Sequence, residues 1–168
     1  MRFRTKLALF ASSVMTVATT GIVLASPALA VTSPGHMCVY FPNDVNYACA
    51  EGAATGSPVP MALDLSQNQD WFMPSAPGSY GKIRVDNSGE QCLQLDAADD
   101  DTVILATCSS GSPTYQEWMP VAAPPGGDFF YSEWNTSYCL TYDEESSIMR
   151  AIGCGDNWYQ IIFSGASG

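Results

Sequence analysis

Gln69-Asp70-Trp71, Gln116-Glu117-Trp118 and Gln160-Ile161-Ile162 are three copies of one short element, in which a Gln precedes a large apolar residue by two positions. The glutamines are 47 and 44 residues apart, and each copy follows a segment of short apolar runs that contains cysteines. A recurring period of this size indicates one supersecondary unit used three times. Because a unit of roughly 45 residues is too small to bury a core of its own, we expect three similar units that share one hydrophobic core.

The first thirty residues have the pattern of a secretory signal peptide. Arg2, Arg4 and Lys6 form a basic start, an apolar stretch covers residues 7–25, and Ala28-Leu29-Ala30 is a small-residue cleavage pattern. The stretch is nearly long enough for a membrane anchor, but the cleavage pattern and the lack of a later apolar run favour secretion. We therefore predict a signal peptide over residues 1–30 and a secreted mature domain over residues 31–168.

The charge of the mature segment excludes two classes of partner. All 17 acidic residues follow Ala30, where Lys82, Arg84 and Arg150 are the only remaining Lys or Arg, which gives a net charge of −14. Such a surface repels phosphate backbones and anionic membranes. We therefore expect no nucleic-acid partner, and no membrane association once the signal peptide is removed.

The six cysteines predict disulfides, because their number is even and the chain is expected to be secreted. Six cysteines allow 15 connectivities. If the units are built alike, the pairs are Cys38–Cys49, Cys92–Cys108 and Cys139–Cys154, each contributing about 2–3 kcal/mol. A metal site is not expected, because the chain has no C-x-x-C pair and one histidine, His36.

The apolar runs indicate strands. No segment combines helical apolar spacing with capping residues; short runs at residues 82–85, 92–95, 102–107, 129–132, 139–142 and 147–152 are separated by Gly, Pro, Asp and Ser. Residues 83–96 align without gaps on residues 130–143, and each segment reads strand, polar turn and Cys-Leu-x-x-Asp. We predict an all-β fold with four strands in each of three repeats, at about 31–77, 78–124 and 125–168. Only Val31–Met37 precede the first cysteine of the mature chain, so the first strand of the first repeat is expected to be short or missing.

The combination of Cys-Leu-x-x-Asp, a second cysteine 16 or 15 residues later, and a threefold Gln-x-Trp resembles the ricin-B-type β-trefoil lectins, over about residues 35–163. The resemblance implies a disulfide-stapled β-trefoil, in which six strands form a short barrel and six form a hairpin cap. It also places Trp71, Trp118 and Ile162 in the shared core, where large side chains bury well.

The resemblance implies four sugar-contacting positions in each unit. They are an Asp two residues after the first cysteine, an aromatic residue two before the second, an Asn, and the Gln of Gln-x-Trp. A pyranose suits such a site because its hydroxyls need donors and acceptors and its C–H face suits a ring. In this chain the Asp position holds Tyr40, Gln94 and Thr141, the ring position Tyr47, Ala106 and Ile152, and the Asn position Asn68, Tyr115 and Tyr159. The candidate carbohydrate-binding residues are therefore Tyr47, Asn68 and Gln69 in the first unit, with Gln116 and Gln160 in the others.

Two further groups are candidates for binding. Aromatic residues expected in turns or near strand ends can form a different glycan or protein contact, or pack against the turns: Tyr115, Trp134, Tyr138, Trp158 and Tyr159. Acidic residues recur in matching loops at 99–101 and 143–145, but neither loop has the spacing of an EF-hand, so solvated turns are expected rather than a Ca²⁺ site.

These patterns favour a binding role without catalysis. Paired carboxylates for glycoside hydrolysis are the alternative that seventeen acidic residues leave open, because the separation of two carboxylates is set by the fold. Neither a Ser-His-Asp nor a Cys-His mechanism is expected from one His near the start of the mature chain and no Gly-x-Ser-x-Gly element, and no cofactor is implied. We predict a secreted, non-catalytic lectin-like domain whose partner is an extracellular glycan or polysaccharide. The alternative is a β-trefoil that has lost its sugar sites and acts as a protein-interaction or protease-inhibitor module, using its loops.

Overall fold

The computed structural model describes residues 34–41, 47–63, 70–86, 90–111, 114–124, 126–155 and 158–166. Twelve strands lie within these ranges, four in each predicted repeat. The first repeat contains β1 (Gly35–Tyr40), β2 (Tyr47–Ala50), β3 (Met61–Ala62) and β4 (Asp70–Phe72). The second contains β5 (Arg84–Val85), β6 (Gln91–Asp96), β7 (Asp99–Thr107) and β8 (Trp118–Ala122), and the third contains β9 (Asp128–Ser132), β10 (Tyr138–Asp143), β11 (Ile148–Gly153) and β12 (Ile162–Ala166). The 3₁₀ helices η2 (Thr114–Gln116) and η3 (Trp158–Gln160) precede the fourth strands of the last two repeats, and the predicted signal peptide lies outside the described residues.

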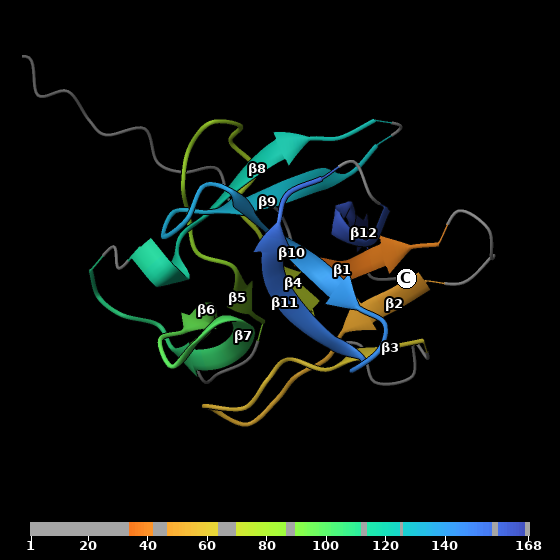
Figure 1. Ribbon diagram of the computed structural model, residues 1–168. Helices are drawn as coiled ribbons and strands as arrows, with labels where there is room; N and C mark the ends of the chain where they lie inside the picture. The colour runs from red at the N-terminus through yellow and green to blue at the C-terminus, as the bar shows by residue number, and fades with distance from the viewer. Residues whose placement is uncertain are drawn as a thin grey trace, which may run out of the picture.

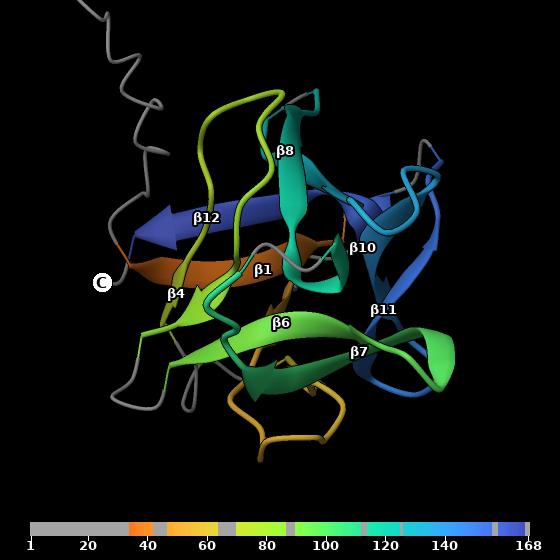
Figure 2. The ribbon, with the colours of Figure 1, turned by 90° about the vertical axis from the view of Figure 1, so that its left-hand side faces the viewer.

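The strand pairing has approximate threefold symmetry and closes on itself. The first strand of each repeat pairs with the last strand of the preceding one: β5 with β4, β9 with β8, and β1 with β12, which lies beside it in Figure 2. The second and third strands of each repeat pair with each other, as β2–β3, β6–β7 and β10–β11. In Figure 1 the β6–β7 and β2–β3 pairs lie on either side of β10 and β11. All pairs are antiparallel, and the chain forms the predicted all-β β-trefoil.

The first repeat has a complete first strand, contrary to expectation. β1 has six residues and pairs with β12, β4 and β2, the same set of neighbours that β9 has in β8, β12 and β10. The reason is that Cys38 lies in β1 itself rather than in a second strand. The short segment before Cys38 therefore only has to supply the start of β1, and the strand continues through Cys38 to Tyr40.

The tryptophan side chains show how the units correspond. Trp71 and Trp118 are fully buried in the shared core, as is Ile162 at the third position. The indole N–H of Trp71 donates to the carbonyl of Ala50, and that of Trp118 donates to the carbonyl of Leu93, both at 3.3 Å. Ala50 is therefore the counterpart of Leu93, and Cys49 is the counterpart of Cys92.

The loop between β2 and β3 bonds to the third strands of the other two repeats. The amide of Val59 donates to the carbonyl of Val103 at 3.0 Å, and the amide of Met149 donates to the carbonyl of Val59 at 2.9 Å. All three side chains are fully buried. The loop after β2 therefore returns to the centre and contributes to the core at Val59, although it contains many small residues.

The three predicted disulfides are confirmed: Cys38–Cys49, Cys92–Cys108 and Cys139–Cys154. They do not all occupy equivalent places. The second and third join the second strand of a unit to the residue just after its third strand, whereas Cys38–Cys49 joins the first strand to the second. Within the described residues, no helix is long and apolar enough to cross a membrane.

Candidate functional site

Gln116 and Gln160 are buried and hold the loop that follows the second cysteine of their units. The side-chain oxygen of Gln160 accepts from the amide of Gly155 at 2.7 Å, and its nitrogen donates to the carbonyl of Gly153 at 2.8 Å. Gln116 makes the same two bonds, to Ser109 and Thr107, both at 3.0 Å. In each case the bonded residues lie one after and one before the second cysteine of the unit.

The second N–H of each of these amides reaches the position that holds Asp in the resembled family. The Gln116 nitrogen donates to the side-chain oxygen of Gln94 at 2.7 Å, and the Gln160 nitrogen donates to the hydroxyl of Thr141 at 3.1 Å. Both donors of each amide are therefore used within the chain, and the side chains are 2% and 0% exposed. Their contact with a sugar stays a prediction, while their structural role is visible in these bonds.

The candidate residues of the first unit are not equivalent to those of the other two. Tyr47 begins β2, is half-buried and lies opposite Tyr40 of β1. Because Cys49 corresponds to Cys92, the Asp position of this unit is Glu51 and its ring position is Ala62, which lies opposite Cys49 as Ala106 lies opposite Cys92. Asn68 and Gln69 lie outside the described residues, so the predicted grouping of Tyr47 with them stays a prediction.

The residue before each buried Gln makes a second kind of contact that is also shared by two units. Tyr115 packs on Trp134, which follows the first strand of the next unit, with ring centroids 5.7 Å apart. Tyr159 packs on Phe41, which follows the first strand of the first unit, with centroids 5.6 Å apart. The two aromatic pairs are thus related by the threefold symmetry of the fold.

The two pairs differ in exposure. Tyr115 and Trp134 are 38% and 55% exposed, and neither is part of the core. Phe41 packs against the core and also contacts the buried Tyr142, while Tyr159 reaches Glu144 through its hydroxyl at 3.3 Å. Tyr138, another of the predicted turn aromatics, packs against the core as well. Tyr159 is 37% exposed, much like Tyr115, so the two pairs differ chiefly in Trp134, which is exposed, and Phe41, which packs against the core.

Two glutamates, Glu117 and Glu133, are close in sequence to Tyr115 and Trp134 and are bonded to each other through their backbones. The amide of Glu133 donates to the backbone carbonyl of Glu117 at 3.0 Å, just beyond the pairing of Trp118 with Ser132. Glu117 is 7% exposed, and burial is the main cause that raises the pKa of its carboxyl; the Lys82 ammonium opposes the rise and the Glu133 charge adds to it. Sequence reasoning did not select either glutamate, because nothing in the repeat pattern separates them from ordinary surface acids.

Lys82 is held close to these glutamates by the loop after Cys108. Its ammonium donates to the carbonyls of Ser109 and Gly111, both at 2.6 Å. The charged end is thus satisfied by backbone oxygens and acts on Glu117 through space. The Tyr115 site comprises Tyr115, Trp134, Glu117, Glu133 and Lys82, and this name is used for these five residues below.

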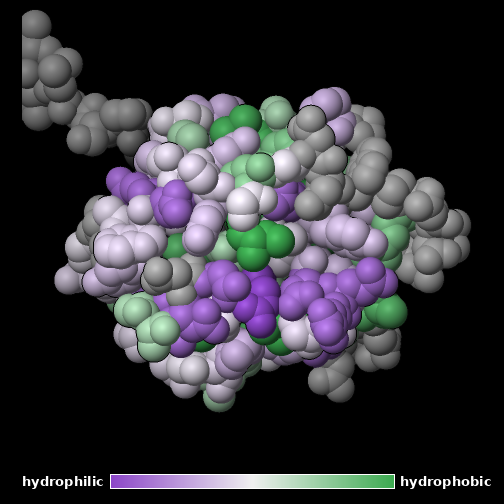
Figure 3. Space-filling model, in the orientation of Figure 1, coloured by the Kyte–Doolittle hydropathy of each residue, from purple (hydrophilic) through white to green (hydrophobic). Residues whose placement is uncertain are grey.

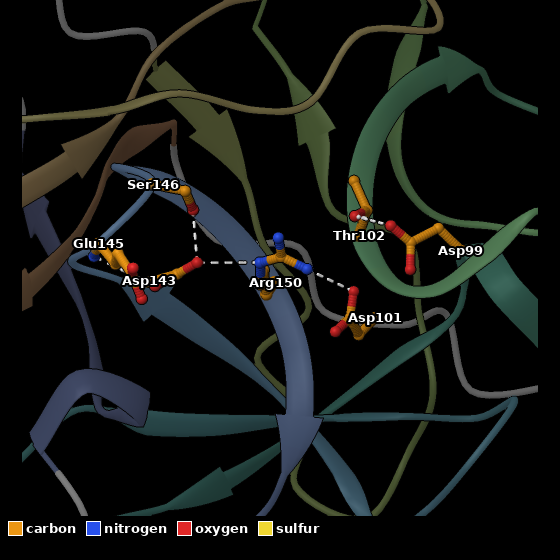
Figure 4. Close-up of polar contacts among 7 residues, drawn as sticks. All are labelled: Asp99, Asp101, Thr102, Asp143, Glu145, Ser146 and Arg150. Atoms are coloured by element: carbon orange, nitrogen blue, oxygen red, sulfur yellow. Dashed lines mark hydrogen bonds and ion pairs between the residues drawn. The ribbon is translucent and has the colours of Figure 1, made fainter.

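A separate acidic cluster lies on the face shown in Figure 3, where hydrophilic residues gather below the centre. Arg150 of β11 bridges Asp143 of β10 at 3.0 Å and Asp101 of β7 at 2.5 Å, as Figure 4 shows. A hydrogen bond from the Ser146 hydroxyl is the main cause that lowers the pKa of Asp143, with the bond from Arg150 contributing. These contacts join two hairpins of different repeats.

The aspartates that recur in the Cys-Leu-x-x-Asp segments have a structural role in the turns after β6 and β10. Asp96 and Asp143 end their strands, and each accepts a hydrogen bond from the amide two residues later, at 3.0 and 3.2 Å. Such bonds are typical of Asx turns. Among the described residues, no three or more His, Cys, Asp or Glu side chains are grouped as metal ligands.

The comparisons with known proteins identify the fold. No family model matches the chain, and no curated protein matches it. Among solved structures, it is similar to ThreeFoil, a designed threefold-symmetric protein, with a TM-score of 0.60, 16% identity and coverage of 76% of this chain and 96% of that one. It is also similar to an endo-β-galactosidase from Clostridium perfringens that releases GlcNAcα1-4Gal, with a TM-score of 0.61, 10% identity and 77% coverage of this chain.

A third similar structure is the cytolethal distending toxin of Haemophilus ducreyi, with a TM-score of 0.56 and 14% identity, covering 80% of this chain and 87% of that one. The chain spans only 31% of the length of the galactosidase. At these identities the likeness is one of fold alone, and it supports the β-trefoil without specifying a ligand.

Proposed function

We propose that this chain is a secreted, non-catalytic, carbohydrate-binding domain that attaches to an extracellular glycan or polysaccharide. The observation that carries the proposal is the exposed Tyr115–Trp134 pair on a disulfide-stapled β-trefoil. Exposed aromatic rings beside polar side chains suit the alternating C–H and hydroxyl surfaces of a sugar. Two of the similar structures, a glycan-releasing galactosidase and a toxin, are consistent with a trefoil module in extracellular proteins.

The three disulfides support the extracellular part of the proposal. Disulfides persist in oxidising compartments and are rare in reducing ones. The basic start, apolar stretch and cleavage pattern of residues 1–30 give the same indication. Expression of the full chain, followed by N-terminal sequencing of the secreted product, tests it; a mature protein that begins near Val31 is expected, and retention of residues 1–30 in the cells' membrane fraction would contradict it.

Sugar binding is tested with the mature, oxidised domain on a glycan array and in pull-downs with insoluble polysaccharides at physiological salt. Circular dichroism and a cooperative thermal transition show in parallel that the domain is folded. We expect binding to at least one class of glycan and no release of reducing ends on prolonged incubation. A folded domain that binds no sugar refutes carbohydrate binding, and release of reducing ends refutes the non-catalytic assignment.

Protein binding is the second candidate, and the acidic cluster around Arg150 favours it. Asp143 and Asp101 are only partly neutralised by Arg150, and Glu144 and Glu145 are exposed next to them. An exposed acidic patch attracts a basic partner and speeds its association. Glu144→Gln/Glu145→Gln should weaken such a partner while leaving glycan binding unchanged, so the same pair of assays separates the two functions.

A further inference from the structure

The Tyr115–Trp134 pair is an exposed pair of rings beside the buried Gln116. At the position where the resembled family stacks an aromatic residue on the sugar, the second unit has Ala106 and the third has Ile152. The rings of the pair come from Tyr115 of the second unit, next to the buried Gln116, and from Trp134 of the following unit. The planes of the two rings are 59° apart, so the pair presents two differently tilted faces.

Two candidate hydrogen-bond acceptors are close in sequence to the rings: Glu117 follows Tyr115 by two residues, and Glu133 directly precedes Trp134. Glu117 is 7% exposed, but its carboxylate oxygens are not isolated from solvent. A ligand hydroxyl can therefore replace water at this carboxylate. Sugar hydroxyls are donors of the right size, and Glu133 lies close enough for its charge to act on the same carboxyl.

The charge of the site restricts its ligand. Two carboxylates face a single ammonium, and two of the ammonium's donors are used by the carbonyls of Ser109 and Gly111. A carboxylate or sulfate on the sugar would meet like charges here and in the surrounding acidic surface. An uncharged hexose or an amino sugar meets no such opposition.

We propose that Tyr115 and Trp134 stack on a pyranose that carries no acidic group, while Glu117 and Glu133 accept hydrogen bonds from its hydroxyl or amino groups. The inference rests on the proposed carbohydrate binding and adds the location of the site and the class of sugar. The ring contact is made across the boundary between two repeats, so only the folded trefoil assembles it.

The test uses the mature domain and a panel of soluble polysaccharides: neutral β-glucan, galactan and glycol chitin, cationic chitosan oligomers, and anionic pectate and heparin. Calorimetry at physiological salt gives the affinities. We expect binding within the neutral or cationic group and none to pectate or heparin. Tyr115→Ala and Trp134→Ala should each lower the affinity by about tenfold or more, which corresponds to about 1.4 kcal/mol.

Matched variants separate this site from general effects. Tyr40→Ala removes another exposed aromatic, which packs edge-on against Phe163, and should leave the affinity unchanged. Glu133→Gln and Glu117→Gln keep the size of the side chains and should weaken binding several-fold. Acrylamide quenching gives an independent readout: bound polysaccharide should protect the wild type from quenching, and this protection should disappear in Trp134→Phe.

The outcomes are distinguishable. If the wild type binds but Tyr115→Ala and Trp134→Ala bind equally well, the sugar site lies elsewhere and the inference is wrong while the proposed function stands. Binding to the anionic polysaccharides alone would refute the class of sugar. If a basic protein is captured instead, and Trp134→Ala loses it, the surface is a protein site. A folded wild type that binds none of the panel removes the inference together with the proposed function.

Discussion

Replacing Gln160 by Ala should destabilise the domain by about 2–4 kcal/mol, because its amide holds the end of the third repeat together. Three hydrogen bonds are lost, to Gly155, Gly153 and Thr141. The two glycines are exposed, so water can replace the amide at their backbone groups, and they contribute little to the loss. Thr141 is buried, and its hydroxyl loses the amide donor but still donates to the carbonyl of Cys139 at 2.9 Å. The space left by the buried Gln160 side chain, together with this lost bond, accounts for most of the cost.

Urea unfolding with disulfides intact measures this change, and a fall of roughly 8–15 °C in the thermal midpoint should accompany it. Gln160→Glu tests the donors separately, since a carboxylate cannot donate to the Gly153 carbonyl and should destabilise more at pH 7 than at pH 4. Thr136→Ala, an exposed turn substitution, should stay within about 0.5 kcal/mol. If Gln160→Ala lowers the free energy of unfolding by less than about 0.5 kcal/mol, the Gln160 amide does not stabilise the end of the third repeat.

Three further substitutions test other parts of the fold. Cys139→Ala/Cys154→Ala opens a disulfide that spans 15 residues and should cost about 3 kcal/mol in urea unfolding. Gly127→Ala should reduce stability by about 2 kcal/mol or more, because φ is +91° there and a Cβ would lie 2.8 Å from the carbonyl oxygen of Ile162; no loss of thermal midpoint would contradict this. The lowered pKa of Asp143 means that its contribution is complete above the pKa of the unfolded carboxyl and is lost as the pH falls through the lower folded value. Asp143→Asn should therefore flatten the loss of stability on acidification below about pH 4, and an unchanged acid titration would be evidence against it.

Much of the fold could be predicted from the sequence repeat, because three copies of one unit imply three similar groups of strands around a shared core. Trp71, Trp118 and Ile162 are buried, as the resemblance to the ricin-B-type trefoils implied, and the cysteines pair within units. These features depend on residues that are close in sequence. The closed strand pairing of β1 with β12 completes the symmetry that the repeat implied.

The first repeat was the part where sequence reasoning failed. Cys38 and Cys92 were aligned because each is the first cysteine of its unit, but Cys38 lies in the first strand and Cys49 takes the place of Cys92. In the sequence, a disulfide from the first to the second strand and one from the second strand to the end of the third both appear as two cysteines 11 to 16 residues apart. The strand pairing and the partners of the Trp71 and Trp118 indoles distinguish the two kinds of disulfide. These contacts join residues that are far apart in the sequence, so the spacing of the cysteines does not predict them.

The Tyr115 site could not be predicted for a related reason, since it joins two repeats. Tyr115 and Trp134 were both noted as turn aromatics, yet their contact depends on how the second unit packs against the third. The glutamates carry no motif at all, and it is the 3.0 Å bond between their backbones that places them together.

The difference between the two aromatic pairs has a definite cause in the core. The residue three positions after the second-strand cysteine is Leu95 in the second unit and Tyr142 in the third, and both are buried. Tyr142 contacts both Phe41 and Tyr159, at centroid distances of 5.5 and 6.2 Å, and so joins that pair to the core. Leu95 has no ring to offer, and the equivalent pair of Tyr115 and Trp134 stays outside the core. Tyr142 thus links one aromatic pair to the core, whereas Leu95 provides no such ring contact for Tyr115 and Trp134.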